Sequence, residues 1–186
     1  MADLISYEYW FSTPNQGGEK HKSTYVFNGL IKTLDIPSNG FCVQLGVNTG
    51  YTFNLMKQHF GEYRTRGIDL FNVNDDSYVY ELNINDIDFN IPIAYAENDI
   101  GELKYDPVPR LNAMKWALKN LIPNGILLTT SNVANKQFGE DVDELAKSFN
   151  CKTERLDNYN NEYWAKYFNE STIWNTISLM LVTKYT

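Results

Sequence analysis

The chain has 186 residues, of which 43% are hydrophobic and 15% aromatic, so it can bury the core of one domain, residues 1–186. Its 23 acidic and 16 basic residues give a net charge of −7, which argues against a nucleic-acid partner. The N-terminus lacks the pattern of a signal peptide, and no apolar run reaches the roughly 18 residues of a membrane span. We therefore expect a cytoplasmic protein with no membrane partner.

The first predicted elements are a helix over residues 23–34, whose apolar residues recur at the spacing of one helical face, and a short apolar strand at 41–45. The helix belongs to an N-terminal segment, residues 1–36, which we expect to be helical and to act as a lid. After the strand, a glycine-containing turn leads into a second helix, which Gly61 ends. The next strand is expected at 65–71.

The strongest helical pattern is an apolar stripe that begins at Leu111 and continues through Leu121 and Ile122, before the sequence Pro-Asn-Gly at 123–125. One more helix is marked by apolar residues between 142 and 149. The remaining strands are expected at 77–84, 91–97, 126–130, 151–156 and 176–185. Helices and strands alternate, which predicts an α/β layer fold with a mostly parallel sheet.

Residues 157–175 do not fit this alternation. They carry six aromatic residues without a clear period, between the last two predicted strands. A connection of this length inside a compact domain is usually functional or disordered, and its aromatic content argues against disorder. Two interpretations stay open: a lid over a site, or an irregular helix packed on the sheet.

Two cysteines, Cys42 and Cys151, lie beside or inside predicted strands. This placement favours reduced, buried thiols over a disulfide framework or a zinc site.

The turn after the first strand has the features of a nucleotide site. Gly46 and Gly50 lie where a buried strand passes into a helix, and glycines there let the backbone approach a ligand. Asp69 follows Gly50 by 19 residues (69 − 50) and ends the second predicted strand, where an acid can accept hydrogen bonds from both ribose hydroxyls. Together they predict an adenosine-containing ligand.

These segments resemble a known family. The sequence VQLGVNTGYT, followed by RGIDLF, resembles the first two strands of class I S-adenosylmethionine-dependent methyltransferases, and ALKNLIPNGILLTT is similar to the helix, turn and fifth strand of that fold. The resemblance covers about residues 41–186. It implies S-adenosylmethionine as cofactor and a Rossmann-like three-layer sandwich, with a mostly parallel seven-stranded sheet that ends in an antiparallel hairpin. An NAD-dependent oxidoreductase would use the same glycines and acid, but its fold lacks that hairpin.

Within the family, the pattern is nearest to the E-x-G-x-x-x-G-x-[ST] motif of small-molecule O-methyltransferases. The resemblance implies that Gln44, Gly46, Asn48, Gly50 and Thr52 bind the cofactor. Asn48 lies where other members have a third glycine, and Asn tolerates a positive φ. Gln44 departs from the motif: the family's acid contacts the amino group of the cofactor, and an amide supplies no charge. The change would weaken binding by about 1 kcal/mol or more.

Two further acids match cofactor contacts of the family. Asp69 matches the acid that binds the ribose. Asp86, after the third strand, matches the residue that contacts the adenine amine, although a loop or helix-capping aspartate is an equally good interpretation.

Catalytic candidates follow the fourth and fifth predicted strands. They are Glu97, Asp99 and Asn132, which could act as a base on the nucleophile or orient it. The metal-dependent members of the group need an Asp before the Asn, and this chain has Ser131 there. We therefore expect no metal ion.

The resemblance implies a methyltransferase that acts on a small-molecule substrate at oxygen. The alternative is a catalytically inactive protein of the same fold, which binds or assembles with another molecule. Gln44 and Ser131 both favour that alternative.

Overall fold

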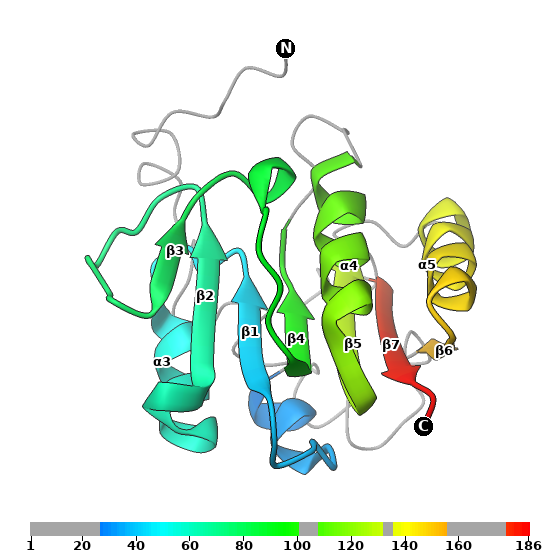
Figure 1. Cartoon of the computed structure of the whole chain (residues 1–186), viewed down its shortest axis with the longest axis horizontal. Helices are drawn as coiled ribbons and strands as arrows, with labels where there is room; N and C mark the ends of the chain where they lie inside the picture. Colours follow the sequence, from blue (N-terminus) through cyan, green and yellow to red (C-terminus); the bar gives the residue numbers. More distant parts are fainter. Residues whose placement is uncertain (1–26, 101–107, 132–135, 156–177) are drawn as a thin grey trace, which may run out of the picture.

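The computed structural model describes residues 27–100, 108–131, 136–155 and 178–186. The strands are β1 (Phe41–Leu45), β2 (Thr65–Asp69), β3 (Val79–Glu81), β4 (Ile93–Asn98), β5 (Leu121–Ser131), β6 (Cys151–Arg155) and β7 (Ser178–Lys184). They form one sheet in the order β3-β2-β1-β4-β5-β7-β6 (Figure 1). Strands β1 to β5 pair in parallel, and β7 pairs antiparallel with both β5 and β6. The predicted sheet, with its antiparallel end, is confirmed.

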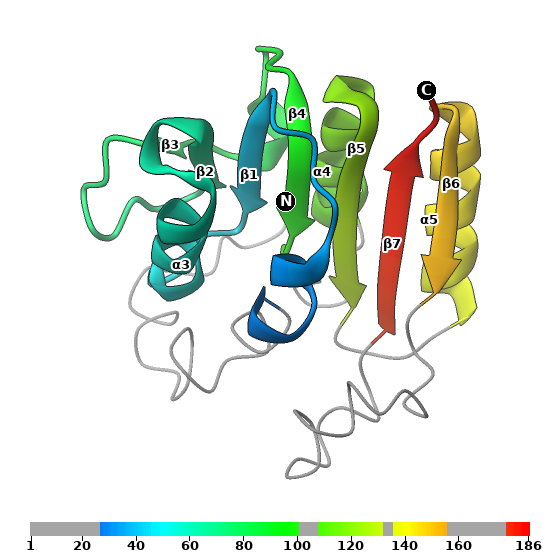
Figure 2. The same ribbon diagram turned by 90° about the horizontal axis from the view of Figure 1, so that it is seen from below.

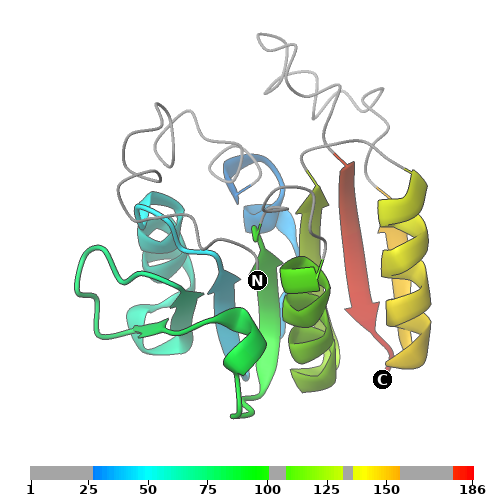
Figure 3. The same cartoon turned by 90° about the horizontal axis from the view of Figure 1, so that it is seen from above.

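Helices cover both faces of the sheet. They are α3 (Tyr51–Phe60), α4 (Val108–Asn120) and α5 (Lys136–Ser148), with short 3₁₀ turns η1 (Ile31–Thr33), η2 (Glu62–Arg64) and η3 (Ile84–Asp86). Figures 2 and 3 show α4 and α5 on one face, and α3 with the helical residues after 27 on the other. This arrangement confirms the three-layer sandwich.

Alternation along the central strands sends side chains to two separate cores. Val43 and Leu45 of β1 pack in the core that contains residues of α4 and α5. Cys42 packs on the opposite face with Tyr95 of β4 and Met56 of α3. β1 is buried on both faces and is apolar except for Gln44, which is why it could be recognised as a central strand.

The sequence-based prediction was wrong about Leu121 and Ile122. Helix α4 ends at Asn120, and Leu121 already pairs with Ile93 of β4. The apolar spacing of the helix continues by chance into the strand, while the register of the β4–β5 pair shifts between Ile93 and Tyr95. That shift accommodates the Pro-Asn-Gly sequence inside β5 instead of after a helix.

The first predicted helix is only partly confirmed. Residues 27–29 are helical, and the chain then tightens into η1. The remainder of the proposed lid segment 1–36, up to residue 26, lies outside the described residues, as does the aromatic segment 157–175.

Both cysteines are free and buried, as predicted. None of the helices in the described ranges is long and apolar enough to cross a membrane.

Candidate functional site

The turn between β1 and α3 has a backbone that few residues tolerate. The φ angles are 87° at Gly46, 56° at Asn48 and 80° at Gly50. All three lie in the left-handed region, where glycine is unstrained and asparagine is the best-tolerated alternative. Asn48 therefore has the positive φ that the sequence indicated it could tolerate, while its match to a glycine of the family stays a prediction.

Asp69 ends β2, and its carboxylate binds this turn. Its Oδ2 accepts a hydrogen bond of 2.7 Å from the backbone N–H of Asn48, and its Oδ1 accepts one of 3.3 Å from that of Phe71. Burial raises the pKa of the Asp69 carboxyl above its ordinary value of 3.8, and these backbone donors limit the rise. The acid thus holds the turn in place, while its contact with a ribose stays a prediction.

Gln44 lies in β1 directly beside Glu97 of β4. The two residues are register partners in the parallel β1–β4 pair, so their side chains leave the same face of the sheet. That face carries Cys42 and Tyr95 and is covered by α3. Gln44 is 2% exposed and Glu97 is 1% exposed. Within the described part of the chain, the Oε1 atom of Gln44 has no hydrogen-bond partner.

The segment after β4 packs directly on the turn after β1. The backbone N–H of Asp99 donates a 2.9 Å hydrogen bond to the carbonyl oxygen of Leu45. A Cβ atom added to Gly46 would lie 3.3 Å from the carbonyl carbon of Asp99. The fold therefore brings half-buried Asp99 next to the predicted cofactor turn, although 53 residues separate it from Gly46 (99 − 46).

Sequence reasoning missed Asn98, which organises the end of β4. Its side chain is fully buried, and its Nδ2 donates to the carbonyl oxygen of Arg110 and to Oγ1 of Thr129, both at 3.3 Å. It joins β4 to α4 and β5. An amide at the carboxyl end of a largely apolar strand was the available signal.

A cavity of about 340 Å³ lies beside the turn, between the β1–α3 and β2–β3 connections. Its lining includes Asn48, Gly50, Phe71 and Asn74, and Nδ2 of Asn74 donates a 2.8 Å hydrogen bond to the carbonyl oxygen of Thr49. The lining does not include Asp69, Gln44 or Glu97. The cavity is therefore lined by the turn itself and not by these three residues.

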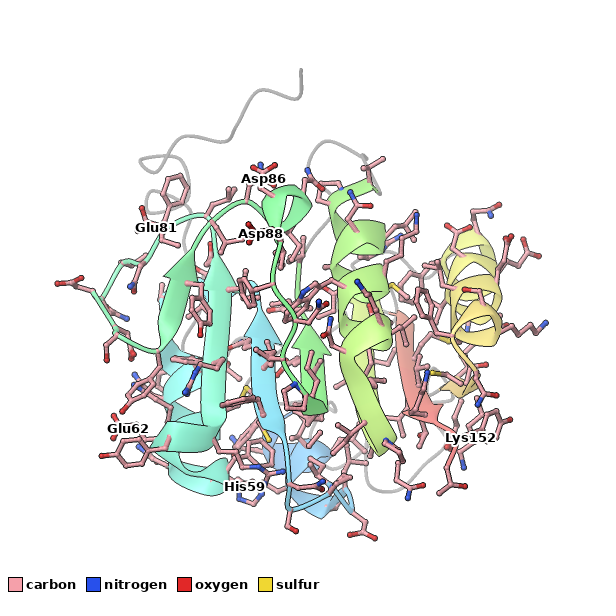
Figure 4. All side chains as sticks on the ribbon, in the orientation of Figure 1. His59, Glu62, Glu81, Asp86, Asp88 and Lys152 are labelled. Carbon is pink, nitrogen blue, oxygen red and sulfur yellow. The ribbon has the colours of Figure 1, made fainter. Side chains whose placement is uncertain are left out.

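Asp86 is exposed at the end of η3. Figure 4 shows it at the edge of the sheet where β1 and β2 end, whereas His59 lies at the opposite edge. The side chain that caps η3 belongs to Asn83, whose Oδ1 accepts a 2.9 Å hydrogen bond from the N–H of Asn85. Asp86 is thus not the capping residue, and its adenine contact stays a prediction.

Of the two remaining predicted residues, Thr52 lies within the described part of the chain and Asn132 does not. Thr52 is 4% exposed in the first turn of α3, next to the glycine turn. Asn132 lies outside the described residues, and only the backbone of Ser131 at the end of β5 precedes it.

No family model and no curated protein sequence matches this chain. Solved structures do match. The plantazolicin methyltransferase BpumL, in complex with a triazolic desmethylPZN analog and SAH, is 10% identical, with a TM-score of 0.63 over 96% of this chain and 94% of that chain. The N-methyltransferase NodS from Bradyrhizobium japonicum WM9, in complex with S-adenosyl-L-homocysteine, is 12% identical, with a TM-score of 0.55 over 89% of each chain.

One similar structure has a different activity. The [4+2]-cyclase SpnF is 13% identical, with a TM-score of 0.53 over 88% of this chain and 80% of that chain. At these identities the likeness extends to the fold alone. The seven-stranded sheet, the order of its strands and the turn after β1 thus give this chain the Rossmann-like fold of class I methyltransferases.

Proposed function

We propose that this protein binds S-adenosylmethionine at the carboxyl edge of β1, β2 and β4, and transfers its methyl group to an oxygen of a small molecule. The observation that carries the proposal is the left-handed turn from Gly46 to Gly50, which the Asp69 carboxylate fastens to the end of β2. A turn of this kind, at the point where strand order reverses between β1 and β4, is where parallel sheets bind nucleotides.

The residues present fit the cofactor. A carboxylate oxygen has more than one lone pair, so Asp69 can accept from ribose hydroxyls while it accepts from Asn48. Gln44 offers an acceptor atom that is buried and unpaired within the described residues. Asp86, at the same edge of the sheet, is proposed to contact the adenine amine.

The bound cofactor would supply a methyl group on a sulfonium, which is already activated for displacement. The chain must then align the acceptor with that methyl group and remove a proton from an acceptor hydroxyl. We assign the base to Asp99, which packs against Gly46 and is half-buried. Glu97 and Asn132 remain candidates from the sequence.

A catalytically inactive binding protein is the second candidate. The buried amide of Gln44, at a position where the resemblance implies a carboxylate, favours it. The similarity to a cyclase also fits a fold that serves chemistry other than methyl transfer.

Isothermal titration calorimetry with S-adenosylhomocysteine tests the proposal. We expect a dissociation constant in the micromolar range, a binding free energy of about −8 kcal/mol, and no heat with NAD as control. Absence of heat from a folded sample would contradict the proposal. If the ligand binds, a panel of small hydroxyl and amine compounds follows, with formation of S-adenosylhomocysteine from S-adenosylmethionine as readout. Turnover with amines only would contradict the assignment to oxygen, and binding without turnover would favour the inactive alternative.

A further inference from the structure

Gln44 and Glu97 form a pair of buried polar side chains on one face of the sheet. They lie opposite each other in the β1–β4 register, and Gln44 is two residues from Gly46. Burying an acceptor without a donor destabilises a protein, because the acceptor loses its hydrogen bonds to water. The Oε1 atom of Gln44 carries such a cost within the described part of the chain. A ligand that donates a hydrogen bond to this atom would remove that cost.

The chemistry of Gln44 and Glu97 indicates the charge of the ligand group that would donate to them. An ionised carboxylate has acceptors only, and Oε1 of the amide is also an acceptor. Glu97 stands two residues after Tyr95 on the same face, and burial, together with the nearby Glu97 carboxylate, raises the pKa of the Tyr95 phenol well above its ordinary value. The phenol therefore stays neutral, and Glu97 is the acidic member of the pair. A group with several N–H donors and a positive charge complements it.

We propose that Gln44 and Glu97 together bind the primary ammonium group of the ligand. This inference rests on the proposed function, where that group is the amino group of the amino-acid part of the cofactor. Neighbouring strands are about 4.8 Å apart, so one ammonium can donate to both side chains. The charge absent at Gln44 is supplied from the adjacent strand, by its register partner Glu97.

This role differs from proton abstraction. A general base must reach the proton of the acceptor, and we assign that role to Asp99, which follows the strand and whose backbone packs on the turn. Glu97 lies inside the strand and is 1% exposed, beside the residue that the resemblance assigns to the amino group. Its charge is therefore used for binding.

The test compares two ligands on the whole chain of 186 residues. One is S-adenosylhomocysteine, and the other is its desamino analogue, in which hydrogen replaces the amino group. Calorimetry of the unaltered protein is expected to show about tenfold or more tighter binding of the first ligand, which corresponds to one charge-assisted hydrogen bond. Equal affinity for the two ligands would overturn the ammonium site even if no variant could be purified.

Variants then locate the charge. Glu97→Gln is expected to bind S-adenosylhomocysteine about tenfold or more weakly, while its affinity for the desamino analogue stays unchanged. The double variant Gln44→Glu with Glu97→Gln keeps the composition and charge of the pair. It is expected to bind S-adenosylhomocysteine more tightly than the desamino analogue again, as the unaltered protein does. Glu62→Gln, an exposed acid at the opposite edge of the sheet, is the matched control and should keep the preference of the unaltered protein (Figure 4).

The outcomes separate this inference from the function on which it rests. If the unaltered protein binds S-adenosylhomocysteine but Glu97→Gln keeps the preference, the ammonium site is wrong and the proposed function stands. If the folded double variant does not restore the preference, the sharing of one charge between the two strands is wrong. If the unaltered protein binds neither ligand, both proposals are overturned.

Discussion

Asp69 combines two demands on one carboxylate. Its hydrogen bonds from the amides of Asn48 and Phe71 are strongest when it is ionised, yet it lies in a partly buried place that disfavours the charge. Burial dominates and raises its pKa above 3.8, since the amide donors offset only part of the desolvation. The turn is thus held by an acid that takes up a proton at a higher pH than an ordinary aspartate does.

This raised pKa predicts the pH dependence of ligand binding. A proton on Asp69 competes with ribose donors, so the affinity for S-adenosylhomocysteine should fall as the pH is lowered through the raised pKa, earlier than for an ordinary aspartate of pKa 3.8. Asp69→Asn should lower the affinity at pH 7 by about tenfold, the value of one hydrogen bond to a charged group. It should also flatten the pH profile. Calorimetry from pH 7 down to about pH 4.5 measures both effects.

Asp75→Asn is the matched control for that experiment. Asp75 lies in the β2–β3 connection, is exposed and has a φ of 50°, which asparagine also tolerates. Its substitution should change neither the affinity nor the pH profile. An Asp69→Asn profile that still falls with pH like that of the unaltered protein would contradict the assignment of Asp69 to the ribose.

At the residue scale, the sequence predicted what local backbone chemistry determines. Gly46 and Gly50 could be assigned to a turn at the strand end, and Asn48 to a position that tolerates a positive φ, because few other residues accept such a backbone. The partnership of Gln44 with Glu97 could not be predicted, because it depends on the register between strands 53 residues apart (97 − 44). A one-residue slip would have moved either side chain to the other face.

At the scale of elements, the first part of β5 has an irregular backbone at Asn124 and Gly125, which the apolar spacing of the preceding helix did not indicate. Asn124 has a φ of 61°, and Gly125 is so close to β4 that an added Cβ would lie 2.8 Å from the carbonyl oxygens of Ile93 and Ile122. Both contacts are to backbone, which cannot rotate away. The strand therefore begins at Leu121 and passes Pro123 with a local irregularity, before the buried run from Ile126 aligns with β4.

The close contact at Gly125 makes a prediction about stability. Gly125→Ala should lower the free energy of unfolding by about 1–3 kcal/mol, the range for overpacking in a core. Urea denaturation measures the change. Asn124→Gly is the control, because glycine accepts the positive φ without a clash, and its effect should stay below about 1 kcal/mol. Equal stability of Gly125→Ala and the unaltered protein would show that β4 and β5 can separate at this point.

Elements with a single period and a clear end were predicted well. The strand Phe41–Leu45 has the predicted bounds, and α3 ends before Gly61, which has a φ of 96°. The end of α4 was misplaced because Leu121 continues the spacing from Leu118, although its backbone is in a strand. Pairing with β4 overrides local periodicity there, and this pairing is a tertiary effect.

At the scale of the whole molecule, the directions of the strands place several connections at the edge of the sheet that carries the glycine turn. β6 and β7 are antiparallel, as are β7 and β5, so β6 runs parallel to β5 and ends at the same edge as β1 and β4. β7 begins at that edge. The chain that joins Arg155 to Ser178 therefore starts and finishes at the edge that carries the glycine turn.

This topology gives the aromatic segment 157–175 a testable role. If it closes over the bound ligand, saturating S-adenosylhomocysteine should slow hydrogen exchange of its backbone amides, because ligand-linked closure lowers the population of open states. Mass spectrometry of peptides from this segment measures the effect, and peptides from α5 should show no change. NAD serves as the control ligand and should leave the segment unaffected. Unchanged exchange in 157–175 at saturation would favour the other interpretation of the sequence, a segment packed on the sheet regardless of ligand.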